Sequence, residues 1–291
     1  MNQTSTEVSL EEEESTQTDL RFFGPSGGWG LVDLRELWTY RELVLALAIR
    51  DLKVRYRQAI VGVAWVVFQP VITVLIFSVL FRLLDRDPTS KGVPYILSAY
   101  AGMVAWQFFA YVLRESSDSL VANRALITKV YFPRIALPFA TILCGLVDAL
   151  IALAVLVLMM FWYQVTPGWQ LLALPIFLLL TVVASLAAGL WFAALNALYR
   201  DVRYVVPFLI QMGFFVSPVM YETKKLVPEE WWWAYGLNPM VSVIEGVRWS
   251  LLGTEPPSLG FSAVSLTAVV VLTLTGLVYF RWAEQWIADR I

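Results

Sequence analysis

Long apolar runs alternate with short polar segments along most of this chain. Four long runs contain no Asp, Glu, Lys or Arg: residues 59–81, 93–113, 169–199 and 257–280. Residues 135–163 form another run, which only Asp148 interrupts, and residues 204–221 form a shorter one. A helix needs about 20 apolar residues to cross the hydrocarbon core of a bilayer. The pattern therefore predicts an all-α integral membrane protein with six transmembrane helices within residues 59–291.

One further apolar stretch, residues 231–244, is too short to cross and is interrupted by Pro239. It begins with three consecutive indoles: Trp231, Trp232 and Trp233. Indoles suit the membrane–water interface, and Asn238 followed by Pro239 is a turn signal. Backbone that enters a membrane without crossing it must be buried in protein or line a cavity. We therefore predict an outer gate of two short re-entrant helices at residues 222–256, between spans five and six.

Charged residues within or beside the apolar runs are few. Glu245 and Arg248 are three positions apart, so they can pair on one helical face, and we predict a stabilising ion pair. Asp148 lies deep in its run, where an acid is a functional candidate by default. Because no other acid, Lys or Arg lies in the middle of a span, local structural pairing of Asp148 is favoured over a proton relay.

The N-terminal segment differs in composition from the rest of the chain. Residues 1–20 contain six acidic residues and no Lys or Arg, and they are rich in Ser, Thr and Gln. Such a segment has almost nothing to bury, so we predict a disordered acidic cytoplasmic tail over residues 1–30. No apolar stretch follows Met1, which argues against a signal peptide. Docking of a partner by the tail is an open alternative.

Residues 31–58 show a helical pattern before the first span. The apolar positions recur at steps of three, four and seven: Leu34, Leu37, Trp38, Leu45, Ala48, Ile49, Leu52 and Tyr56. Charged residues occupy much of the other face, and the C-terminal half is basic. This pattern predicts an amphipathic helix in the membrane interface, in contact with anionic lipid. It leaves open a second role as a platform for a cytosolic partner.

The distribution of basic residues predicts the orientation. Of the 21 Lys and Arg residues, 15 lie before the first span, in the second and fourth loops, or after the sixth span. Cytoplasmic segments of membrane proteins carry an excess of Lys and Arg. We therefore predict that both termini are cytoplasmic.

Composition narrows the possible chemistry. Hydrophobic residues make up 59% and charged residues 15% of the chain, whereas soluble domains are about 25% charged. There is no His and one Cys, which excludes imidazole catalysis and paired-cysteine zinc motifs. No Gly-x-x-x-x-Gly-Lys-Ser/Thr segment is present, so we expect no ATP site of this kind on the chain. We also expect no catalytic, cofactor or metal site and no nucleic-acid partner. The pair Asp85 and Asp87 is interpreted as a solvated turn, which makes a membrane-embedded transferase the weaker alternative.

Two further features are candidates for function. The loop at residues 114–138 is too long for a tight turn, and residues 119–127 can form a short amphipathic helix that a partner could grip, or that serves only as a connector. Aromatic residues of three spans form possible stacked faces: Trp65, Phe68, Trp106, Phe109, Phe214, Phe215 and Tyr221. Flat rings can line a carbohydrate path, but Trp and Tyr also belt membranes at both interfaces, and the sequence leaves both readings open.

Several blocks in order carry a resemblance to a known family. They are the basic entry 45–58 with GVAWVVFQP at 62–70, NRALITKVYFP at 123–133, YRDVR at 199–203, SPVMY at 217–221, LNP at 237–239, and Arg248. From about residue 31 to its end, the chain resembles the permease subunit of type-2 ABC exporters, in the class that exports O-antigen, capsule or teichoic-acid-type polysaccharides. The long acidic tail departs from the compact family pattern.

The resemblance implies a homodimer in the bacterial inner membrane with two cytosolic ATPase subunits, which carry ATP and Mg²⁺, and a lipid-linked polysaccharide as substrate. It implies ATPase coupling at Asn123, Arg124, Leu126, Lys129, Tyr131 and Phe132. It implies outer gate helices containing Trp231, Trp232, Trp233, Asn238, Pro239, Glu245 and Arg248, and a path lined by the aromatic residues named above. A type-2 permease for a drug or a small lipid is the alternative with the same scaffold.

Overall fold

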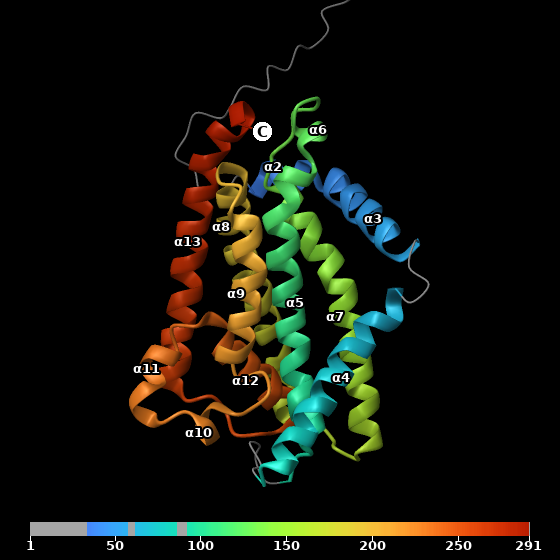
Figure 1. Cartoon of the computed structure of the whole chain (residues 1–291), viewed down its shortest axis with the longest axis vertical. Coiled ribbons are helices and arrows are strands. Elements are labelled where there is room, and N and C mark those ends of the chain that lie inside the picture. The colour runs from blue at the N-terminus through green and yellow to red at the C-terminus, as the bar shows by residue number, and fades with distance from the viewer. Residues whose placement is uncertain (1–33, 58–61, 86–91, 291) are drawn as a thin grey trace, which may run out of the picture. The chain divides into compact units, whose positions relative to one another are not determined.

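The computed structural model describes residues 34–57, 62–85 and 92–290, and every regular element in these ranges is a helix (Figure 1). Five helical segments there are long and apolar enough to cross a membrane. They belong to α4 (Gly62–Leu83), α5 (Tyr95–Ala122), α7 (Ala136–Trp162), η1 (Trp169–Ala173) with α8 (Leu174–Leu198), and α13 (Leu259–Arg290). The prediction of an all-α integral membrane protein is confirmed. The acidic tail lies outside the described residues.

The fifth predicted span is shorter in the structure than in the sequence pattern. Helix α9 (Val202–Val216) has 15 residues, which at 1.5 Å per residue is about 22 Å long, less than the hydrocarbon core of about 30 Å. It ends where Ser217 adopts an extended backbone before Pro218. The apolar run 204–221 is therefore a short helix followed by unwound backbone, and the count of six spans stays a prediction.

The predicted interface helix is divided into α2 (Leu34–Thr39) and α3 (Arg41–Arg57). Helix α3 packs on α7 through Val44, Leu47 and Ala48. Of the predicted apolar positions, Ala48 is buried against α7, whereas Trp38, Leu45 and Ile49 are exposed on a neighbouring face. Helix α3 therefore has two apolar faces, one against protein and one free to contact lipid.

Helix α5 is the centre of the bundle. Within the apolar windows of the two helices, 78% of α5 is buried against 11% of α4. Helix α8 approaches α5 closely at Gly189, where a Cβ atom would lie 2.9 Å from Cβ of Ser116. Small residues of this kind let helix backbones approach in membranes, where van der Waals packing drives association.

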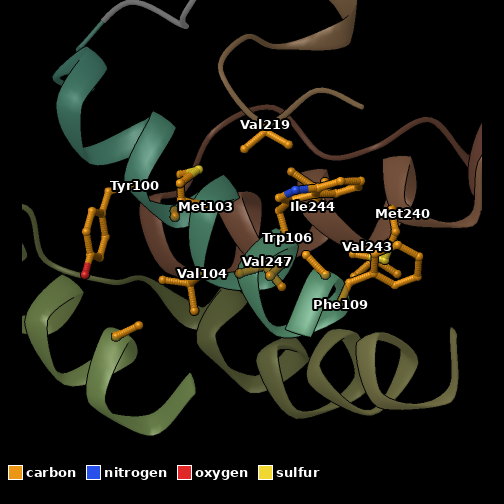
Figure 2. Packing of buried hydrophobic residues seen from close by; sticks show 14 of the residues in the cluster. Tyr100, Met103, Val104, Trp106, Phe109, Val219, Met240, Val243, Ile244 and Val247 are labelled. Carbon is orange, nitrogen blue, oxygen red and sulfur yellow. The ribbon is translucent and has the colours of Figure 1, made fainter. Parts of the chain in front are cut away.

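The two ends of the bundle have separate hydrophobic clusters. Helix α6 (Arg124–Ile127) marks one end, called here the α6 end, and α10 (Thr223–Leu226) and α12 (Pro239–Leu252) mark the α12 end (Figure 1). Toward the α12 end, residues of α5 such as Trp106 pack with Ile244 of α12 and with Val219 (Figure 2). At the α6 end, Ala48 of α3, Leu120 of α5 and Phe280 of α13 share a second cluster.

Polar side chains also join helices at the α6 end. Ser116 of α5 and Thr141 of α7 are hydrogen-bonded through their hydroxyls at 2.6 Å. The amide Nδ2 of Asn196 in α8 donates to the carbonyl oxygen of Ser117 at 2.9 Å and to Oδ1 of Asp118 at 3.0 Å. Since buried polar groups are costly unless they are hydrogen-bonded, these pairs fix the register of α7 and α8 against α5.

We predict that Gly189→Ala destabilises the protein. The added Cβ would displace Ser116 in the contact between α8 and α5, and overpacking of this kind costs about 1–3 kcal/mol. Gly260→Ala in α13 is the matched control, because a Cβ there meets nothing within 4 Å and alanine is the better helix former. Thermal unfolding in detergent should show a lower midpoint for Gly189→Ala and an unchanged or higher one for Gly260→Ala. Equal shifts in both variants would contradict the close approach of α8.

Candidate functional site

The predicted coupling segment, at the α6 end, starts with a break in α5 at Asn123. Helix α5 continues to Ala122, and Asn123 both ends it and precedes the four-residue helix α6. The prediction of one short helix over residues 119–127 was therefore wrong, because Ser119 to Ala122 extend the central helix. Leu120 is fully buried there. The segment is a rigid continuation of α5 followed by a single helical turn.

The predicted coupling residues divide into anchored and displayed side chains. Phe132 is only 4% exposed and packs in the cluster at the α6 end, so it anchors the loop. Leu126 packs partly against the same cluster. In contrast, Arg124, Lys129 and Tyr131 are exposed. The anchored residues hold a loop whose outer surface is basic.

Helix α3 is tied to the same break. Nη2 of Arg50 donates to Oδ1 of Asn123 at 2.8 Å, while Nδ2 of Asn123 donates to the carbonyl oxygen of Ser119 at 2.9 Å. The single Asn side chain therefore caps the last turn of α5 and holds the interface helix. This contact connects two predicted features, the interface helix and the coupling loop.

Asp148 of α7 is paired locally, as the sequence predicted. Nη1 of Arg55 lies 2.6 Å from its Oδ2, and the hydroxyl of Tyr56 donates to its Oδ1. The guanidinium of Arg55 also lies over the ring of Tyr111, 4.5 Å from the ring centroid. Both oxygens of the acid are thus engaged by the end of α3, so Asp148 acts as a docking point for that helix.

The segment predicted as a gate of two short helices contains one longer helix and two single helical turns. Helix α12 has 14 residues, whereas α10 and α11 (Trp232–Tyr235) have four each. As the turn signal predicted, Asn238 begins α12: its side chain accepts from the backbone N–H of Met240 at 3.0 Å, with Pro239 in the first turn. The helix ends at Gly253, whose φ of 65° suits glycine.

Arg248 is the hub of this region. It is 1% exposed, and its guanidinium donates to four backbone carbonyls: Ser98 at 3.1 Å, Pro218 at 2.9 Å, Val219 at 3.0 Å and Tyr221 at 3.2 Å. Three of these carbonyls belong to the unwound segment after α9. Burial disfavours the charged form of the Arg248 side chain, whereas the nearby carboxylates of Glu222 and Glu245 stabilise it.

The predicted ion pair between Glu245 and Arg248 was wrong. No ion pair joins these two side chains within the part of the chain that the structure describes; instead Oε1 of Glu245 accepts from the backbone N–H of Thr223 at 3.0 Å. The physical reason is that unwound backbone exposes carbonyl and N–H groups, and these compete for both side chains.

Glycine makes the approach to Arg248 possible. A Cβ at position 102 of α5 would lie 2.5 Å from the carbonyl oxygen of Val219 and 2.9 Å from Nη2 of Arg248. Even alanine at this position would collide with both groups. Gly102 therefore lets the unwound segment and the guanidinium lie directly on the central helix.

Two of the three consecutive tryptophans at the α12 end are exposed, which suits the membrane–water interface predicted from the sequence. Trp231 and Trp233 are exposed, while Nε1 of Trp232 donates to the carbonyl oxygen of Val227 at 3.0 Å. Beside them, Nζ of Lys224 binds Oε2 of Glu255 at 2.9 Å. The hydrogen bond from Lys224 and its charge lower the pKa of Glu255.

The predicted path aromatics do not form one surface. Trp106 and Phe109 of α5 are buried, their ring centroids 5.4 Å apart, and Phe214 of α9 lies 6.3 Å from Trp106. These rings are core residues that join α9 to α5. The hydroxyls of Tyr221 and Tyr235 are hydrogen-bonded at 2.7 Å, which fixes the unwound segment.

Only part of the aromatic set is accessible. Trp65 and Phe68 of α4 and Phe215 at the end of α9 are each more than half exposed. A role for these three in a carbohydrate path stays a prediction. Within the described ranges no cluster of three or more His, Cys, Asp or Glu side chains could hold a metal ion.

The sequence profile of the family described as ABC-2 type transporter matches residues 42–252. The chain belongs to the ABC-2 type transporter family. The match begins in α3 and ends on the last residue of α12, so it includes the coupling segment and the Arg248 hub. It confirms the resemblance to type-2 ABC permeases.

Relatives with descriptive names cover most of this ABC-2 type transporter chain. It is 29% identical over 212 residues to the O-antigen export system permease protein RfbA of Myxococcus xanthus, which covers 72% of this chain and 80% of the relative. It is 27% identical to the protein of the same name from Klebsiella pneumoniae, over 85% and 94% of the two chains. It is 25% identical to the polysialic acid transport protein KpsM of Escherichia coli, over 83% and 93%.

Several residues that build the ABC-2 fold around these sites were not singled out from the sequence. Gly102 lies in an apolar run, and its importance comes from a close approach that the sequence does not show. Arg50 is one of several basic residues on α3, and nothing in the sequence distinguishes it from the others. Asn196 offered a signal that could have been used, because an amide in a long apolar run must find a partner.

We predict that Arg248→Lys strongly destabilises this ABC-2 type transporter. A lysine ammonium has three donors on a flexible stem and cannot reach four carbonyls arranged around a planar guanidinium. Leaving even one or two buried carbonyls unpaired costs about 2–4 kcal/mol. The exposed Arg82→Lys, at the end of α4, is the control. Thermal unfolding in detergent should show a lower midpoint for Arg248→Lys and an unchanged midpoint for Arg82→Lys. A midpoint equal to that of the wild type in Arg248→Lys would contradict the role of Arg248 in holding this region together.

Proposed function

We propose that this chain is the membrane permease of an ABC exporter that moves a lipid-linked polysaccharide, such as an O-antigen, across the bacterial inner membrane. The observation that carries the proposal is the agreement of the family match with relatives named for O-antigen export and polysialic acid transport. Both named cargoes are polysaccharides. A drug or small-lipid permease uses the same scaffold, but neither these relatives nor the accessible aromatic rings favour it.

Energy for transport comes, in this proposal, from two cytosolic ATPase subunits that bind ATP and Mg²⁺. The chain has no Walker-type sequence of its own. The exposed side chains of Arg124 and Lys129, on a loop anchored by Phe132, provide the contact surface. The α6 end then faces the cytoplasm, in agreement with the excess of basic residues in its segments.

Two copies of the chain form the permease in this proposal. Helix α9 presents an unpacked apolar face along its length: Tyr204, Val205, Phe208, Leu209, Met212, Phe215 and Val216. Helix α4 likewise exposes Trp65, Phe68, Ile72, Leu75, Ile76 and Val79. These faces support pairing of two subunits around a path to which Trp65, Phe68 and Phe215 contribute aromatic surface. Conformational change driven by the ATPases would widen and close that path.

The proposal predicts the behaviour of the purified chain and of a deletion strain. The chain alone should show no ATPase activity, and co-expression with an ABC ATPase subunit from the same organism should yield a stable complex. Deletion of the chain should remove the long surface glycan, which silver-stained gels or glycan-specific antibodies detect, and plasmid-borne wild-type protein should restore it. Normal surface glycan in the deletion strain, together with absence of any ATPase complex, would exclude the proposed function.

We predict that the double reversal Arg124→Glu with Lys129→Glu uncouples the permease from its ATPase. Both side chains are exposed, so folding should be unaffected, while a contact between opposite charges becomes repulsive. Transport should fall by about tenfold or more, with the protein still present in the membrane at wild-type amount. The control is Arg82→Glu with Lys225→Glu, two exposed positions toward the other end. Unchanged transport in the first double variant would refute the coupling role of this loop.

A further inference from the structure

A groove along α5 has polar walls that neither the coupling segment nor the Arg248 hub uses. It lies between α4, α5 and α7, has a cavity volume of about 150 Å³, and reaches Arg55 at the end of α3. Three of its α5 residues, Tyr100, Gln107 and Arg114, follow one another at intervals of seven, so they lie on one face of the helix. At 1.5 Å per residue they span about 21 Å of a hydrocarbon core about 30 Å thick. The groove therefore gives the central helix a polar face across much of the membrane.

The charges around the groove balance one another, so they do not select a charged ligand. Arg55 is bound to Asp148, with 2.6 Å between its Nη1 and Oδ2 of the acid. Arg114 is followed by Glu115, which does not line the groove but interacts electrostatically with both Arg55 and Arg114. Two guanidinium groups thus face two carboxylates, and no net charge remains for a bound ion to neutralise.

The uncharged polar groups of the groove, in contrast, lack partners. The side chain of Tyr100 is fully buried, and its hydroxyl has no hydrogen-bond partner. In Figure 2 this hydroxyl is directed away from Val219 and Ile244, at the edge of the labelled cluster. The side-chain amides of Gln69 in α4 and Gln107 in α5 make no hydrogen bond within the part of the chain that the structure describes. Since lipid offers neither donors nor acceptors, these three groups are available to a ligand that has both.

The remaining walls fit a flat ring with one apolar face. Trp65 of α4 lines the groove and is 56% exposed, and Met103, Val104 and Phe108 of α5 add apolar surface. A cavity of about 150 Å³ has the size that holds one six-membered ring. A sugar unit combines the required properties, because its hydroxyl groups donate and accept hydrogen bonds while its C–H face packs on a flat aromatic ring. An acyl chain would leave the three polar groups unpaired.

We propose that this groove is a sugar-binding subsite of the transport path. It holds one uncharged sugar unit of the cargo at a time, by hydrogen bonds to Tyr100, Gln69 and Gln107 and by packing on Trp65. The inference rests on the proposed function for the identity of the cargo, and it adds the residues that recognise that cargo. The groove meets the path at Trp65, which belongs both to its wall and to the exposed face of α4.

Tyr100→Phe is the most direct test, because it removes only the hydroxyl that has no partner in the protein. The midpoint of thermal unfolding in detergent should be unchanged or higher, since a buried unpaired group is lost. In the deletion strain complemented with this variant at wild-type amount, surface glycan should appear about fivefold more slowly, because one hydrogen bond to the cargo is missing. The exposed Tyr163→Phe, at the end of α7, is the control and should match the wild type in both measurements.

Gln107→Leu tests the amide by a binding measurement that does not depend on export. A neutral oligosaccharide, released from the surface glycan of the strain by mild acid, should raise the unfolding midpoint of the purified full-length protein. Gln107→Leu should remove most of this shift, whereas the exposed Gln285→Leu in α13 should keep it. Oligosialic acid of the same length should give a smaller shift, because the groove has no net positive charge to offer an acidic sugar.

Three results would overturn the inference. A lower unfolding midpoint in Tyr100→Phe would mean that the hydroxyl has a structural partner within the protein. Export at the wild-type rate in Tyr100→Phe would mean that the hydroxyl does not bind the cargo. An oligosaccharide shift that is absent from the wild type, or undiminished in Gln107→Leu, would leave a groove that holds only water. Normal surface glycan in the uncomplemented deletion strain would overturn the proposed function instead, and the oligosaccharide shift would then decide on the groove alone.

Discussion

The hydrogen bonds from Arg248 to four backbone carbonyls are the interaction on which the α12 end depends. In a membrane, backbone that leaves a helix must find its partners inside the protein, because lipid offers none. Helix α9 ends after 15 residues, and the segment that follows is unwound. The guanidinium of Arg248 donates hydrogen bonds to the backbone carbonyls of Pro218, Val219 and Tyr221 in this segment, and to that of Ser98 in α5. The guanidinium of α12 thus satisfies three carbonyls of the segment at which the short helix α9 ends.

Helix α5 connects that end to the opposite one. Near its start, Gly102 leaves room for the carbonyl of Val219 and for Arg248. At its other end, Asn123 stops the helix and binds Arg50 of the interface helix. Both candidate sites are thus built on one buried helix, with the buried aromatic rings of Trp106 and Phe109 between them. Rigid elements of this kind hold functional segments in fixed positions relative to one another.

Much of this arrangement could be predicted from hydrophobic patterning, because membrane helices must be long and apolar. The pattern identified the five long helices, the break at Asn238 and Pro239, and local pairing of Asp148. It could not identify which side of α3 packs, since both Val44 and Leu45 are apolar and neighbours in sequence point to different faces. It also predicted an ion pair between Arg248 and Glu245. Helical spacing identifies partners on the same helix, but it gives no information about backbone groups of another segment that bind the side chain. Burial of Trp106 could not be predicted either, because aromatic residues are common in protein cores, on lipid-facing surfaces and along transport pathways.

The attachment of α3 connects the loop that starts at Asn123 with α7. Three contacts hold this helix: Arg50 to Asn123, Arg55 with Tyr56 to Asp148, and Sγ of Cys144 to the carbonyl oxygen of Ala48 at 3.3 Å. Two of them reach α7, and the third reaches the last turn of α5, directly beside α6. Its other apolar face, with Leu45 and Ile49, is exposed. If the loop contacts an ATPase as proposed, a displacement of Asn123 would act on α3 through the hydrogen bond from Arg50, and α3 would transmit it to α7 through the contact of Arg55 with Asp148.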